Sequence, residues 1–443
     1  MQRASGYTSL LLDPSFPYGE DLLQFIWEQR LFEQRGLRTT DGREVEVLKP
    51  GRIQHNSGPD LVDARVRIGE QQWAGTVEVH LRSSEWEAHG HALDPAYDNV
   101  VLHVVYEHDR EVTTTKGALL PTVELFPRIS TDSISLYRDL MRGKGFVPCA
   151  PLLGHVDRSK VSPWLERVLV QRLERKTVEV EALYARLDND ASETVYHLLA
   201  RAFGLKVNAE PFTMLAHALP LRTVLKYRDD AIRTEALLFG QAGLLRTDFV
   251  DEHPRTLQRE HALLAHMHGL QPAPLAAWKF ARMRPMNFPT VRIAQFVQVL
   301  MRCDGGFSEL LEVDDVPSLE RLLDIEASPY WNERYRFDVP SALRPKRLGK
   351  AGIHHILINA IVPALFALGR LQGKPAYADR ALSLLEQLPP ERNTLLDGWA
   401  SLGLAADTAA RGQALIELKN ELCSRRRCLS CGIGNQLLRS TVK

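Results

Sequence analysis

Two neighbouring segments near the N-terminus alternate between apolar and polar residues with the period of two that is typical of β-strands. The alternation runs through residues 60–68 and again through residues 73–81. The polar residues 69–72 between them form a connection short enough for a hairpin. The pattern therefore predicts two paired strands joined by a tight turn.

The predicted hairpin brings three titratable side chains together. Glu78 and His80 share the face of the second strand opposite its apolar residues, and Asp60 begins the first strand with the parity of that strand's apolar residues. Two carboxylates about 4 Å apart repel by roughly 4 kcal/mol at an effective dielectric constant near 20. Such a pair either shares a proton or holds a cation, and two oxygen ligands suit Mg²⁺. A metal site at Asp60 and Glu78 is therefore predicted.

Further apolar patterns place this hairpin in an α+β arrangement. Residues 18–32 carry the broad apolar face of a helix, and residues 43–48 alternate as an edge strand. Residues 84–90 indicate a short helix, and residues 99–106 form the nearly continuous apolar run of a strand covered on both faces. The order helix, strand, strand, strand, short helix, strand predicts an α/β domain over residues 1–150.

Beyond a turn-rich stretch near residue 150, the apolar period becomes that of helices. We expect a largely α-helical domain over residues 151–420, followed by a cysteine-rich tail at residues 421–443. Besides a long helix after residue 162, helices are predicted at residues 193–203, 231–239, 256–268, 291–303, 353–368 and 377–387.

Composition narrows the class of protein only in part. The 443 residues are 44% apolar and 25% charged, which is ordinary for a globular protein of two or three domains. Lys+Arg and Asp+Glu both total 55, so any nucleic-acid surface has to be locally basic. No N-terminal signal and no 18-residue uncharged apolar stretch is recognised, which predicts a cytoplasmic protein without a membrane partner.

The cysteines predict a second metal site. Cys423, Cys428 and Cys431 place three thiols within nine residues, a spacing that suits zinc or an iron–sulfur cluster. Both usually need a fourth ligand, for which Cys149 in a Pro-Cys-Ala-Pro turn is the candidate, whereas Cys303 has the pattern of a buried helical cysteine. Three free thiols on a flexible tail are the alternative. An odd number of cysteines argues against a disulfide framework.

The order of elements, with Pro59-Asp60 on one strand and Glu78-Val79-His80 on the next, resembles the PD-(D/E)XK nuclease core. The resemblance implies a restriction-endonuclease-like mixed sheet flanked by helices. It also implies an enzyme that hydrolyses phosphodiesters of nucleic acid with Mg²⁺ or Mn²⁺, and DNA is favoured over RNA as the substrate. It implies Asp60 and Glu78 as metal ligands and catalytic residues, and Glu28 as the first-helix carboxylate of the metal site. Position alone also fits a solvated helix charge for Glu28.

One residue departs from that motif, because His80 stands where the motif has lysine. His80 would position water, bind the metal, or mark a core that binds nucleic acid or acts as a scaffold without cutting it. The neighbouring His55, His89, His91 and His103 also allow a transition-metal site and a zinc hydrolase, although their spacing is not a standard zinc pattern. The mid-strand His103 fits a hydrogen-bonded core residue better.

Two basic loops in the helical part are candidates for phosphate contacts, which we assign to Arg284, Arg344, Lys346 and Lys350. Solvation alone is the simpler explanation of such loops. More widely, the segments GTVEVHLRSSEW and YDNVVLHVVYEHD, EALLFGQAGLL at 235–245, RPMNFPTVRIAQ at 284–295 and the cysteine-rich end resemble an uncharacterised bacterial family, known as a domain of unknown function. That resemblance implies no activity, and the oligomeric state stays open.

Overall fold

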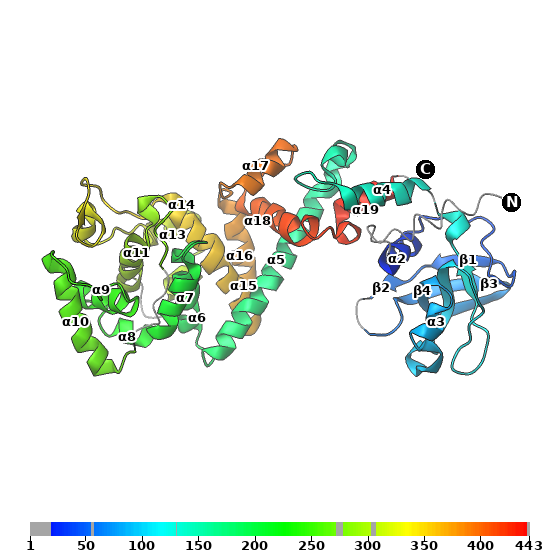
Figure 1. Ribbon diagram of the computed structural model, residues 1–443, viewed down its shortest axis with the longest axis horizontal. Helices are drawn as coiled ribbons and strands as arrows, with labels where there is room; N and C mark the ends of the chain where they lie inside the picture. Colours follow the sequence, from blue (N-terminus) through cyan, green and yellow to red (C-terminus); the bar gives the residue numbers. More distant parts are fainter. Residues whose placement is uncertain (1–18, 55–56, 130, 272–277, 303–306, 441–443) are drawn as a thin grey trace. The chain divides into compact units, whose positions relative to one another are not determined.

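The computed structural model describes residues 19–54, 57–129, 131–271, 278–302 and 307–440, and its contacts divide the chain into two compact units (Figure 1). One unit comprises residues 1–164 together with 418–443, and the other comprises residues 165–417. The cysteine-rich end therefore belongs to the N-terminal unit. The predictions that concern His55, Cys303 and the first 18 residues lie outside the described residues.

A mixed sheet forms the centre of the N-terminal unit, in the order β1-β3-β4-β5-β6 with β2 also paired to β3. β1, β2 and β4 run antiparallel to β3, whereas β5 runs parallel to β4 and β6 parallel to β5. The predicted α+β class and hairpin are confirmed. The strands are β1 (Val45–Lys49), β2 (Arg52–Ile53), β3 (Leu61–Ile68), β4 (Gln71–Arg82), β5 (Val100–Glu107) and β6 (Thr122–Glu124).

A β-bulge in β3 corrects the predicted side-chain alternation. Ala64 pairs with Gly75, but Leu61 pairs with Val77, so two residues of β3 stand against one residue of β4. The extra residue is accommodated by Asp63, whose φ of 59° lies in the left-handed region. Leu61 therefore shares the buried face of Ala64, and Asp60 lies on the other face rather than with the apolar residues of its strand.

Among its described residues, this unit also contains the helices α2 (Glu20–Glu28), α3 (Glu85–Ala88), α4 (Thr131–Arg142) and α19 (Gly432–Arg439). The apolar side of α2 packs where Leu81 of β4 and Tyr106 of β5 are found. Trp86 of α3 is fully buried in a separate cluster with Val100. The chain between α3 and β5 adds two short 3₁₀ turns, η1 (His91–Leu93) and η2 (Pro95–Tyr97).

The second unit is helical, as predicted, and adds a two-stranded ribbon, β7 (Arg334–Arg336) with β8 (Val339–Pro340). Its first helix, α5 (Arg158–Arg186), begins within the N-terminal unit. The remaining helices are α6 (Ala191–Phe203), α7 (Ala209–Ala218), α8 (Leu221–Leu225), α9 (Ala231–Gln241), α10 (Glu252–His268), α11 (Pro289–Arg302), α12 (Ser308–Glu312), α13 (Val316–Leu322), α14 (Lys350–Ile356), α15 (Val362–Leu371), α16 (Pro375–Gln387), α17 (Thr394–Ser401) and α18 (Ala409–Glu417).

One helical stretch corrects the expectation that no segment is long and apolar enough to cross a membrane. The run Lys350–Leu371, which joins α14 and α15 through a π-helical turn, passes that test by length and composition. However, 67% of its apolar window is buried inside the protein. The segment therefore fits a core helix.

The bulge provides a stability test of the fold. Asp63→Val should lower the free energy of unfolding by about 1–3 kcal/mol, because a β-branched residue is strained at positive φ. Arg65→Val, at an exposed position of the same strand, is the matched control and should change it little. Urea unfolding measures both. Equal stability of the two variants would contradict the assigned bulge.

Candidate metal centre

Asp60 and Glu78 meet where the β3–β4 hairpin opens beside β5. The Asp60 backbone N–H donates to Glu78 Oε2 at 3.0 Å, and the Val79 backbone N–H donates to Asp60 Oδ2 at 3.0 Å. Each carboxylate is thus held by a backbone group of the opposite segment, which fixes both in orientation. The structure therefore brings Asp60 and Glu78 together, as the hairpin predicted.

Three imidazoles lie close to one another beside Glu78. His80 lies on β4, the solvent-exposed His89 caps the end of α3, and the buried His91 begins η1. Their ligand atoms all lie within 4.8 Å of one another. His80 Nε2 is 3.2 Å from His89 Nδ1, and Glu78 Oε1 is 3.3 Å from His91 Nε2 and 3.7 Å from His80 Nε2.

Three of the separations between these ligand atoms are close to those expected around a tetrahedrally coordinated ion. A metal bound by imidazole nitrogens at about 2.1 Å has its ligand atoms about 3.4 Å apart. The distances of 3.2, 3.3 and 3.7 Å bracket that value. His80, His89 and His91 therefore form a candidate site for one divalent cation, with Glu78 Oε1 beside His80 and His91.

The ring orientations are fixed by a second layer of aromatic residues. His80 Nδ1 is 2.8 Å from Nε2 of the fully buried His103, and this contact leaves His80 Nε2 facing the site. His91 stacks on Tyr97 with ring centroids 3.8 Å apart, and Trp86 packs edge-on against it at 5.4 Å. The centre is thus walled by aromatic rings and opens to solvent at His89.

Burial controls the protonation of this cluster. Burial and the neighbouring Asp60 raise the pKa of Glu78 to about 8, and burial likewise raises the pKa of Asp60. Burial and three other imidazoles lower the pKa of His80 to about 2. His80 is consequently a neutral imidazole at pH 7, able to bind a metal but unable to replace the permanent cation of a lysine.

Of the carboxylates of α2, Glu20 interacts electrostatically with Asp60 and Glu78, whereas the predicted Glu28 is hydrogen-bonded elsewhere. Glu28 accepts the Ile53 backbone N–H at 3.0 Å and the Gln29 side-chain amide at 2.9 Å, so it ties α2 to β2. Glu20, the first residue of α2, has its pKa raised to about 7 by burial and then by the charge of Asp60. The signal that sequence reasoning missed is an acidic residue at the start of this helix.

The four predicted phosphate contacts all belong to the helical unit and form no common site there. Arg284 and Arg344 are exposed, and Lys350 pairs with Glu320 at 2.8 Å. Lys346 is fully buried and donates to the backbone carbonyls of Asn332 and Arg344 at 3.1 and 2.8 Å. An ammonium engaged in this way inside the protein is not available to a phosphate.

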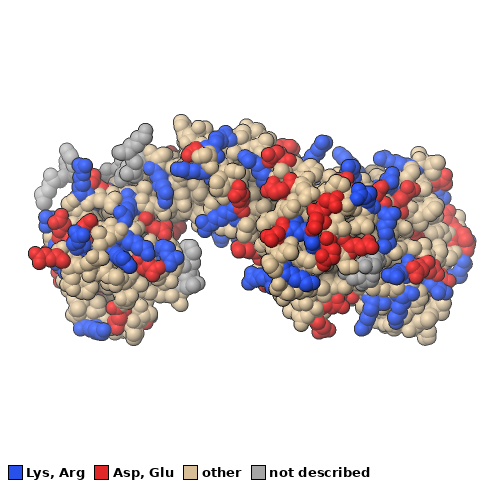
Figure 2. All heavy atoms as spheres, turned by 180° about the vertical axis from the view of Figure 1, so that it is seen from behind, with Lys and Arg blue, Asp and Glu red and all other residues tan. Residues whose placement is uncertain are grey.

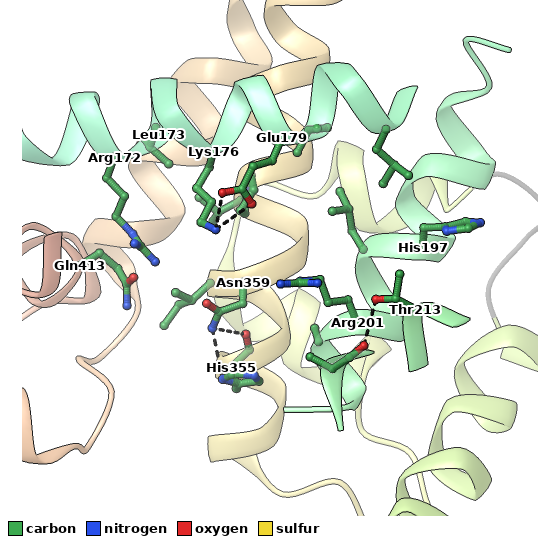
Figure 3. A pocket seen from close by; sticks show the side chains of 18 of the residues that line it. Arg172, Leu173, Lys176, Glu179, His197, Arg201, Thr213, His355, Asn359 and Gln413 are labelled. Carbon is green, nitrogen blue, oxygen red and sulfur yellow. Dashed lines mark hydrogen bonds and ion pairs between the residues drawn. The ribbon is translucent and has the colours of Figure 1, made fainter. Parts of the chain in front are cut away.

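A basic pocket in the helical unit offers different cations. It has a volume of about 490 Å³, and Figure 3 shows Arg201 extending into it near Asn359. Lys176 in its wall is paired with Glu179 at 2.9 Å. Among the described residues, Arg186, Arg201 and Lys206 of the same pocket have no ion-pair partner. Elsewhere, basic and acidic side chains are interspersed over the face in Figure 2.

Metal-free protein should lose stability as the pH rises from about 5 to about 8, since the pKa of Glu78 is raised from 4.5 to about 8 on folding. Within that window the folded state binds more protons than the unfolded state, so stability falls with rising pH. Glu78→Gln should flatten the slope by up to about 1.4 kcal/mol per pH unit. Urea unfolding with a chelator measures it, with Glu70→Gln in the hairpin turn as control. An unchanged slope in Glu78→Gln would contradict the raised pKa of Glu78 in the folded protein.

Comparison with known proteins identifies one family whose match includes the candidate centre. The family described as "Protein of unknown function (DUF2851)" matches residues 20–394, which include every residue of the centre. No curated protein matches the chain, and no solved structure does. Because the match spans most of the sequence, the chain belongs to the family described as protein of unknown function (DUF2851).

Proposed function

We propose that this protein is a metal-dependent hydrolase that cleaves phosphodiester bonds of nucleic acid. The observation that carries the proposal is the convergence of Asp60 and Glu78 with three imidazoles where the β3–β4 hairpin opens. A bound divalent cation can activate water for phosphodiester hydrolysis, and carboxylates beside it can hold the ion or accept a proton. The order of elements around them, with a parallel strand beside the hairpin, is similar to that of the PD-(D/E)XK nucleases.

Glu78, His80, His89 and His91 would hold the ion. Three imidazoles with one carboxylate favour Zn²⁺ or Mn²⁺ over Mg²⁺, which prefers six oxygen ligands. A bound ion would lower the pKa of water and polarise a phosphoryl oxygen. His103 is a positioning residue, because it fixes the ring of His80 without facing the site.

The remaining carboxylates would move protons. Asp60 is held by the Val79 N–H through Oδ2 and lies beside the ligand Glu78. Burial raises the pKa of Asp60 and brings that of Glu20 to about 7. A carboxylate with a pKa nearer neutrality is a better general base at pH 7 than an ordinary one. We therefore assign Asp60 to accept the proton of the attacking water, and Glu20 to support it.

The nucleic-acid backbone would also contact the basic pocket of the helical unit. Arg186, Arg201 and Lys206 supply cations that no carboxylate of the described chain neutralises. Phosphates are the commonest nucleic-acid partners of such side chains, and they carry little sequence information. This pocket replaces the two predicted basic loops as our candidate surface for the backbone, with DNA as the substrate favoured over RNA.

One observation favours a second candidate function. With a pKa near 2, His80 lacks the positive charge that the motif's lysine places beside the attacking water. The centre could then hold a structural ion in a protein that binds nucleic acid or acts as a scaffold without cutting it. The cleavage experiment separates the two functions.

Wild-type protein loaded with Zn²⁺ or Mn²⁺ should cleave plasmid, linear or single-stranded DNA, and removal of the ion with a chelator should abolish cleavage. His91→Ala should weaken metal binding by at least tenfold, since it removes a ligand. Asp60→Asn should keep the metal and lose at least about 100-fold in rate, because it removes the proton acceptor. Calorimetric titration and a cleavage assay measure the two effects.

His155→Ala is the control, because His155 is exposed in the same unit and lies outside the centre. It should leave both metal binding and rate unchanged. Stoichiometric metal in the wild type without cleavage of any DNA or RNA would exclude the nuclease and leave the second candidate. A metal affinity unaffected by His91→Ala would contradict the ligand set itself.

Charge reversal in the basic pocket should weaken nucleic-acid binding. Arg201→Glu should lower the affinity for a DNA duplex and reduce the slope of log affinity against log salt by about one, since one phosphate contact is lost. Arg222→Glu, an exposed change on α8, is the control of equal charge. Fluorescence anisotropy at several salt concentrations measures both. Equal slopes for the two variants would exclude the pocket as the binding surface.

A further inference from the structure

The C-terminal segment places three thiols beside a fourth from a distant part of the sequence. Cys149 precedes the 3₁₀ turn η4 (Ala150–His155), and Cys423 ends the π-helical turn η8 (Leu418–Cys423). Cys428 begins the turn η9 (Cys428–Ser430), and Cys431 caps the start of α19. All four residues belong to the N-terminal unit, and none of these four cysteines forms a disulfide.

The four thiols form one electrostatic group. Burial raises the pKa of each of them, and for every pair the charge of one thiol raises the pKa of the other. Cys149, Cys428 and Cys431 are 8%, 8% and 7% exposed. Four neighbouring cysteines, three of them buried, have the chemistry of a metal-ligand set.

The backbone around Cys431 is shaped to hold this arrangement. A Cβ at Gly434 would clash with the Cys428 carbonyl oxygen, and a Cβ at Gly432 would come within 2.7 Å of the Trp164 ring. The backbone N–H groups of Ile433 and Gly434 are directed at the Cys431 sulfur. The buried indole N–H of Trp164 makes no hydrogen bond of ordinary geometry. It nevertheless acts to lower the pKa of the Cys431 thiol. N–H groups aimed at a sulfur stabilise a thiolate and therefore point to a cation bound there.

The spacing of the sulfur atoms separates the possible metals. A single zinc ion with Zn–S bonds of about 2.3 Å holds its ligands about 3.8 Å apart. No three of these four sulfur atoms all lie within 4.8 Å of one another, in contrast to the histidine centre. A cluster that inserts its own iron and sulfide atoms between the thiolates needs the wider spacing. Cys423-x4-Cys428-x2-Cys431 with a fourth cysteine elsewhere is also a ligand spacing known from [2Fe–2S] proteins.

We propose that Cys149, Cys423, Cys428 and Cys431 bind an iron–sulfur cluster that ties the C-terminal segment to the N-terminal unit. The positive charge of the adjacent arginines suits the net negative charge of a thiolate-bound cluster. Arg426 favours the thiolate form of Cys428 and donates to the Gly143 carbonyl at 3.4 Å, which brings a cation to the site. The cluster would help to hold α19, which packs beside α4 in the same unit (Figure 1).

The test is anaerobic purification of the full chain, followed by analysis for iron, acid-labile sulfide and zinc and by visible absorption before and after reduction. Wild type should contain iron and sulfide in similar amounts and bleach on reduction. Cys149→Ser and Cys431→Ser should each lose most of the iron. Ser430→Ala, an exposed change between two ligands, should retain it.

Two results would overturn the proposal. One zinc ion per chain without sulfide would assign the thiols to a zinc site. Absence of iron from the wild type, both as isolated and after incubation with ferrous iron and sulfide, would leave the thiols without a cluster. Because wild type alone yields both results, misfolding of a cysteine variant does not affect the test. Neither result bears on the histidine centre, whose ligands are different residues.

Discussion

The β-bulge at Val62 and Asp63 is the constraint on which the metal centre depends. Strict alternation from Ala64, which pairs with Gly75, would turn Asp60 to the face of Val79. The bulge shifts the register so that Leu61 stands opposite Val77, and Asp60 then lies opposite Glu78. Two reciprocal backbone hydrogen bonds hold the pair there. One inserted residue thus converts a core-facing aspartate into a member of the site.

The carboxylate pair in turn defines the place of the imidazoles. Buried carboxylates near each other are unfavourable without a cation, and the imidazoles beside them offer nitrogen ligands for one. His80 belongs to a strand at the centre of the sheet, whereas His89 and His91 come from the short irregular segment after it. Trp86 and Tyr97 restrict that segment by packing on His91. The candidate ligand set therefore combines a residue of a central strand with two residues of an irregular segment.

The strands and the Asp60–Glu78 pair could be predicted because alternation and turn residues are local signals. The bulge could not be predicted, since register depends on the partner strand. Glu28 is predicted from its place on the first helix, although only tertiary packing decides which acidic residue lies near the site. The role of His91 depends on a 3₁₀ turn that no periodicity reveals. Lys346 illustrates the same limit, because a basic loop residue can be buried by carbonyl partners distant in sequence.

The central claim is that Glu78, His80, His89 and His91 bind one transition-metal ion. The most direct measurement is X-ray diffraction from crystals of the metal-loaded protein, recorded above and below the absorption edge of zinc or manganese. The account predicts one anomalous peak at bonding distance from Glu78 Oε1 and from one ring nitrogen of each histidine. No peak among these four residues, or a peak bound by Asp60 and Glu20 without any imidazole, would contradict it.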